Sequence, residues 1–132
     1  MKLRNFAVTG CLLGGLTALT WAQEGDPQQA LMKNAGAEMK ALKKNLDGGM
    51  KDDAAKDARH LAGIFKQVEE IWAKTNTAGA VKLAKDAQAA SNDIASGTGD
   101  ATVSFKALGA SCAACHAAHR EKSEDGSYRT KP

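Results

Sequence analysis

Hydrophobic residues recur every three or four positions along four successive segments of this chain, and β-branched residues never alternate over a useful length. This spacing is typical of amphipathic α-helices. The expected helices cover about residues 28–46, 53–74, 78–96 and 101–122. Residues 123–132 are polar and are expected to form a frayed tail. The pattern therefore predicts an all-α fold.

Residues that favour helix ends separate these segments. Asp26 is a suitable N-cap for the first helix, with Pro27 at a position where a missing N–H costs nothing. Glycine-containing turns at residues 48–49 and 97–99 are expected to end the first and third helices, and Asp100 is expected to cap the fourth. Four helices with short connections favour an up-down-up-down antiparallel four-helix bundle.

The expected inner faces of the helices are narrow and rich in alanine. In the first two helices they contain Leu31, Ala35, Met39, Leu42 and Leu46, then Ala54, Ala58, Leu61, Phe65, Val68 and Trp72. In the last two they contain Val81, Leu83, Ala84, Ala87, Ala90 and Ile94, then Ala101, Phe105, Leu108, Cys112, Cys115 and His119. A small bundle lined by alanine packs weakly on its own, and a large planar apolar cofactor would supply the missing buried surface.

The N-terminus has the layout of a secretory signal peptide. Lys2 and Arg4 give a positive start, residues 6–18 are mostly apolar, and residues 20–22 offer small side chains at a cleavage point. The apolar run is shorter than the roughly 20 residues of a comfortable membrane span, although an uncleaved N-terminal anchor is the alternative. We expect residues 1–22 to be removed, which leaves residues 23–132 as an exported, periplasmic domain with no membrane span.

Charge and cysteine content limit the possible functions of the mature chain. Loss of Lys2 and Arg4 lowers the formal net charge by two from +3, and no basic block stands out, so nucleic acid is not an expected partner. Cys11 leaves with the signal peptide, so the mature chain keeps Cys112 and Cys115. A secreted disulfide scaffold would need more cysteines, more widely spread.

The remaining cysteines belong to the segment SCAACHAAHR, residues 111–120, in which His116 follows Cys115 directly. The C-x-x-C-H spacing is the attachment signature of c-type haem, in which both thiols bond to the macrocycle and the histidine ligates the iron. On a helix, Cys112, Cys115 and His116 share one face because they are three and four positions apart. The motif therefore predicts one covalent haem c.

Two other chemistries compete for these residues. Zinc could be held by the same three residues with His119 as a fourth ligand, but structural zinc sites usually draw their ligands from separated parts of the chain. A thioredoxin-like dithiol belongs at the start of a helix in a βαβ unit, for which this sequence gives no sign. Haem is the preferred interpretation.

With this motif near the end of a fourth helix, the chain resembles the class II cytochromes c, the cytochrome c′ family. SCAACHAAHR is the most specific part of the resemblance, and the N-terminal AQEGDPQQALMKNAGAEMKAL is similar to the family's first helix. The resemblance covers essentially residues 23–132. It implies a four-helix bundle with covalent haem, an exported setting and no organic substrate, and thus a protein that is not an enzyme.

The family has two branches, which differ at the second axial position of the iron. A high-spin branch leaves this position open and binds small gases, whereas a low-spin branch fills it with methionine and carries electrons. The sequence alone leaves Met32, Met39 and Met50 as candidates, and methionine also packs in bundle cores. The family's pattern puts Met32 at the second axial position and Gln28 where an arginine often occurs.

The resemblance thus implies a low-spin, methionine-ligated carrier of single electrons between redox partner proteins, with His116 and Met32 on the iron. The alternative is a five-coordinate binder of nitric oxide or carbon monoxide. Arg120, one turn after His116, is a candidate partner for a haem propionate, although it would also suit an ordinary solvated position. His119 replaces a usually aromatic family residue. A homodimer is compatible with the sequence.

Overall fold

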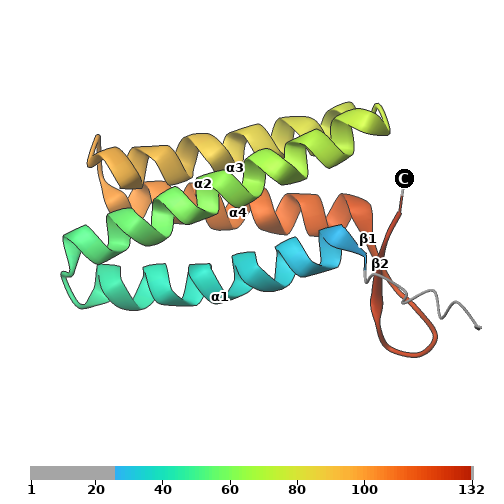
Figure 1. Ribbon diagram of the computed structural model, residues 1–132, viewed down its shortest axis with the longest axis horizontal. Helices are drawn as coiled ribbons and strands as arrows, with labels where there is room; N and C mark the ends of the chain where they lie inside the picture. Colours follow the sequence, from blue (N-terminus) through green and yellow to red (C-terminus); the bar gives the residue numbers. More distant parts are fainter. Residues whose placement is uncertain (1–25, 132) are drawn as a thin grey trace, which may run out of the picture.

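The computed structural model describes residues 26–131 and consists of four helices followed by a short hairpin. The elements are α1 (Pro27–Asp47), α2 (Lys51–Lys74), α3 (Ala78–Ser96), α4 (Ala101–His119), β1 (Arg120–Lys122) and β2 (Tyr128–Thr130). Figure 1 shows that consecutive helices run in opposite directions, with their connections at alternating ends. The predicted four-helix arrangement is confirmed. The signal peptide prediction falls on residues 1–22, which lie outside the described residues.

The expected helix caps form as the sequence predicts at both ends of the bundle. The Asp26 carboxylate accepts from the Gln28 N–H at 3.0 Å, and the Asp100 carboxylate accepts from the N–H groups of Thr102 and Val103 at 2.7 and 3.1 Å. Gly97 ends α3 with a φ of +67°, a left-handed conformation that glycine adopts without strain. These local signals set the starts of α1 and α4 and the end of α3.

The core lies along α2 and α3. All six predicted inner residues of α2 are buried. On α3, Val81 and Leu83 are half-buried, and the buried stripe contains Ala80, Ala84, Ala87, Ala90, Ser91 and Ile94. Small residues at positions 80, 84, 87 and 91 let α3 approach its neighbours closely. This close approach leaves the larger Val81 and Leu83 only half-buried.

The packing around the bundle is uneven, and this unevenness positions the site. α1 packs along α2, α2 along α3, and α3 along α4, whereas α1 and α4 contact each other very little. A closed bundle normally buries a seam between its first and last helices. Here the two helices remain apart, and side chains from both line one cavity.

The predicted frayed tail is wrong, and α4 ends at His119 rather than near Lys122. Arg120 adopts an extended backbone, and β1 pairs antiparallel with β2 in the register Arg120↔Thr130, Glu121↔Arg129 and Lys122↔Tyr128. The cause is the turn at residues 123–127, where the Asp125 carboxylate accepts from both the N–H and the hydroxyl of Ser127. Gly126 supplies the positive φ, +84°, that this turn needs.

Within residues 26–131, no helix is both long enough and apolar enough to cross a membrane.

Candidate functional site

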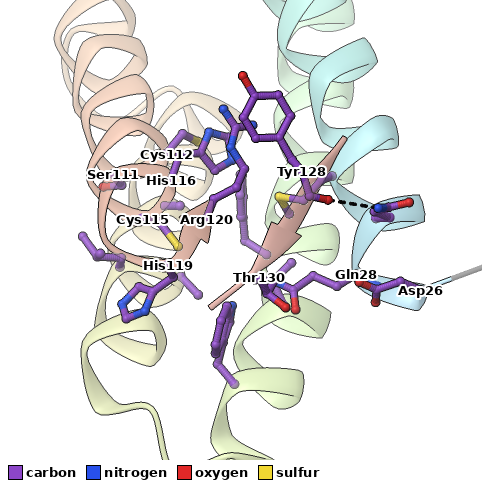
Figure 2. Close-up of a pocket in the computed structure, with 18 of the residues that line it drawn as sticks. Asp26, Gln28, Ser111, Cys112, Cys115, His116, His119, Arg120, Tyr128 and Thr130 are labelled. Carbon is purple, nitrogen blue, oxygen red and sulfur yellow. Dashed lines mark hydrogen bonds between the residues drawn. The ribbon is translucent and has the colours of Figure 1, made fainter. Parts of the chain in front are cut away.

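A cavity of about 190 Å³ lies beside α4 and receives side chains from all four helices and from the hairpin. Its walls include all five residues predicted from the sequence to form the site, namely Met32, Cys112, Cys115, His116 and Arg120. Figure 2 shows the side chains of α4 on one side of this cavity and those of α1, with β2, on the other. The structure therefore brings together residues that are about 80 positions apart in the chain.

Cys112 and Cys115 are free, half-buried thiols on the cavity side of α4. Burial raises the pKa of the Cys112 thiol to about 11, with a smaller contribution from Cys115, and burial also raises the pKa of Cys115. A redox dithiol works in the opposite way, because its attacking cysteine needs a lowered pKa to form the thiolate. These two cysteines thus have the environment of protected thiols, which argues against the dithiol interpretation.

His116 is also half-buried and follows the second cysteine on the same helix. Burial lowers the pKa of its imidazole, and the positive charge of Arg120 lowers it further. A histidine must be neutral to ligate a metal, so both effects favour the state that a ligand requires.

The zinc interpretation requires Cys112, Cys115, His116 and His119 to surround one point. Across the part of the chain that the structure describes, no group of three or more His, Cys, Asp or Glu side chains is placed to hold a metal ion. His119 instead packs on Trp72 of α2, with ring centroids 5.2 Å apart and planes inclined by 49°. A haem needs fewer ligands from the chain, since the protein supplies only the axial ligands of its iron.

The three methionines that compete as axial ligands occupy different environments. Met32 is half-buried on α1 and lines the cavity. Met39 lies further along α1 and packs against the core, whereas Met50 is 40% exposed at the connection between α1 and α2. His60 of α2 has a side chain that is 52% exposed and lies 3.5 Å from the Glu38 carboxylate, and it does not line the cavity. Met32 is therefore the candidate that shares the cavity with His116.

The hairpin closes one end of this cavity, which was not expected from the sequence. The Gln29 side-chain amide of α1 donates to the Tyr128 carbonyl at 3.2 Å, and the Lys131 N–H donates to the His119 carbonyl at 3.0 Å. Tyr128, Arg129 and Thr130 thereby join the lining. The Asp125-Gly126 pair, a strong turn signal, was the indication in the sequence that could have revealed this hairpin.

The residues present fit a covalently bound haem. Two thiols and an imidazole lie on one face of α4, a thioether faces the same cavity from α1, and the apolar side chains of Phe65, Val68 and Leu83 are part of the lining. Ligand pockets in proteins commonly combine a mostly apolar wall with a few polar groups. The chain matches no protein-family model, no curated protein and no solved structure with which it was compared.

Proposed function

We propose that this chain is an exported, periplasmic monohaem c-type cytochrome that carries single electrons between redox partner proteins. In this proposal Cys112 and Cys115 form thioether bonds to one haem c, and His116 and Met32 are its axial ligands. The observation that carries the proposal is that these four side chains, from helices at opposite ends of the chain, line one cavity. The resemblance of SCAACHAAHR to the class II cytochromes c supports the same assignment.

The haem iron would supply the one-electron exchange between its ferric and ferrous states. The chain's contribution is to hold His116 and Met32 on separate helices, so that each ligand keeps its place while the charge of the site changes. A thioether ligand raises the reduction potential relative to an open or oxygen-ligated site. Such a site needs no bound substrate, and we propose a carrier rather than an enzyme.

The apolar lining sets the electrostatic environment of the site. Phe65 and Val68 are buried core residues that face the cavity, and the hairpin covers its end. Exclusion of water lowers the local dielectric and disfavours the state with the higher net charge. Since the ferric state carries one more positive charge than the ferrous state, this lining would also raise the reduction potential.

The ferrous absorption spectrum with and without carbon monoxide tests the proposal against its nearest alternative. A carrier with Met32 on the iron gives a six-coordinate ferrous spectrum that carbon monoxide changes slowly or not at all. Immediate formation of a carbon monoxide complex would instead identify a gas-binding protein with an open axial position. A protein without a haem spectrum after expression with a haem-attachment system would contradict both functions.

A further inference from the structure

Two buried polar atoms at the cavity have no hydrogen-bond partner within the described residues: Trp72 Nε1 and His119 Nδ1. Both residues line the cavity, and their rings are in contact, with centroids 5.2 Å apart. Trp72 is only 4% exposed, so water does not readily reach its indole N–H. A buried donor without a partner is destabilising, and native proteins rarely leave such a group unpaired.

Both atoms can act as hydrogen-bond donors. The indole Nε1–H is a donor only. His119 Nε2 points toward Gly79, where a Cβ would lie 3.6 Å away, and Gly79 is in the first turn of α3. The positive end of that helix favours a lone pair on Nε2 and hence the proton on Nδ1. The pair therefore presents two N–H groups.

Among residues 26–131, no acidic side chain is a hydrogen-bond partner of these donors. Asp26 lines the cavity, but its carboxylate caps α1 through the Gln28 N–H. The other charged residues of the lining, Arg120 and Arg129, are cationic. An acceptor must then come with whatever fills the cavity, and the surrounding positive charge favours an anionic one.

We propose that Trp72 Nε1 and His119 Nδ1 form a carboxylate-binding subsite that receives one propionate of the haem. This inference rests on the proposed function and extends it, because it assigns the recognition of the macrocycle's acidic edge to α2 and the last turn of α4. A carboxylate can accept both hydrogen bonds at once, and hydrogen bonds to a charged acceptor are stronger than neutral ones. Arg120 is then not the principal propionate partner.

The test compares metal-free protoporphyrin IX with its dimethyl ester, which lacks ionised carboxylates. Each is titrated into the full-length chain with reduced thiols, and binding is followed by quenching of tryptophan fluorescence and by the shift of the porphyrin absorption. The intact chain should bind the free acid roughly tenfold or more tighter than the ester, which corresponds to at least one charged hydrogen bond. The variant His119→Phe should lose most of this preference, and Leu83→Ala, which changes the same cavity without removing a donor, should keep it.

The outcomes separate the subsite from the proposed function. Tight binding of both porphyrins with no preference in the intact chain would overturn the subsite and leave the haem proposal intact. Failure of the intact chain to bind either porphyrin, together with failure to acquire haem on maturation, would overturn both. An unchanged preference in His119→Phe would assign the carboxylate to other residues and also overturn the subsite.

A second measurement uses the matured protein and does not depend on the folding of the haem-free chain. Two donors stabilise the ionised propionate and lower its pKa. Trp72→Phe keeps the aromatic ring but removes one donor, so the pH at which the reduction potential changes with propionate ionisation should rise. A profile identical to that of the unsubstituted protein would contradict the subsite.

Discussion

The guanidinium carbon of Arg120 lies 4.0 Å from the centre of the Tyr128 ring, and this stacking joins the first residue after α4 to the returning strand of the hairpin. The same Tyr128 receives the hydrogen bond from Gln29 of α1. One residue of the hairpin therefore connects two helices that scarcely contact each other.

Tyr128→Ala is expected to loosen the hairpin while the four helices remain folded. An exposed cation–π contact contributes about 0.5–1 kcal/mol, which corresponds to a roughly two- to fivefold rise in the open population. Amide hydrogen exchange of Lys131, whose N–H bonds the His119 carbonyl, measures this opening directly. Arg129→Ala is the matched control. It removes the exposed Arg129–Glu121 ion pair on the same hairpin, and such exposed pairs contribute little to stability. Equal exchange rates in the unsubstituted chain and Tyr128→Ala would show that the stacking does not hold the hairpin.

Met32→Ala is expected to open the second axial position of the matured protein. Loss of the thioether should abolish the weak ferric absorption band near the red end of the spectrum, lower the reduction potential and allow rapid carbon monoxide binding. Met39→Ala serves as the control, since Met39 packs against the core and does not line the cavity. If Met32→Ala keeps the red band and the potential, Met32 is not the ligand.

The stability of the bundle is expected to be sensitive to its few large core residues. Leu42 of α1 is fully buried in the main core cluster, so Leu42→Ala should lower the free energy of unfolding by about 2–5 kcal/mol. Val103→Ala removes an exposed side chain from α4 and should change it by less than about 0.5 kcal/mol. Chemical denaturation of both variants measures the difference. Similar midpoints for the two would contradict the assignment of the core.

Asp100 is expected to make stability depend on pH. Hydrogen bonds from the N–H groups of Val103 and Thr102 lower the pKa of its carboxyl, so the folded state favours the ionised form. A depressed folded pKa contributes stability above the unfolded value, about 3.9, and this contribution disappears as the pH falls through the lower folded value. The thermal midpoint of the chain should therefore exceed that of Asp100→Ala at neutral pH, and the difference should shrink below about pH 4.

The matched control for this prediction is Asp100→Asn, which keeps a capping oxygen but cannot ionise. Its thermal midpoint should stay close to that of the original chain at neutral pH. Its stability should not show the acid-dependent loss that comes from protonation of this carboxyl. A constant difference between Asp100→Ala and the original chain from pH 7 to pH 2 would contradict the role of ionisation.

The sequence predicts the parts of the fold that depend on local signals. Asp26 and Asp100 cap the helices for which their positions suggest them, and the stripe from Ala54 to Trp72 is buried as its spacing indicates. The predicted buried stripe of α3 was partly wrong. Hydrophobic periodicity does not account for the close approach of neighbouring helices, and this approach favours the burial of Ala80 and Ser91 over that of Val81 and Leu83. Leu83 instead faces the cavity.

The candidate site was predictable where its residues form a motif and not where they meet through the tertiary fold. Cys112, Cys115 and His116 are adjacent in sequence, so their shared face follows from helical geometry. The contact of His119 with Trp72 depends on how α4 crosses α2, for which the sequence gives no spacing rule. The hairpin was missed because the polar composition of residues 123–132 outweighed a turn signal at Asp125-Gly126.

Covalent attachment of haem to Cys112 and Cys115 is the central claim, and intact-protein mass after acid–acetone treatment tests it most directly. The chain is expressed with a haem-attachment system, extracted, and treated with an alkylating reagent under denaturing conditions. We expect a coloured protein whose mass exceeds that of residues 23–132 by one haem and whose thiols do not react. A colourless protein with the mass of residues 23–132 alone and two alkylated cysteines would contradict the attachment.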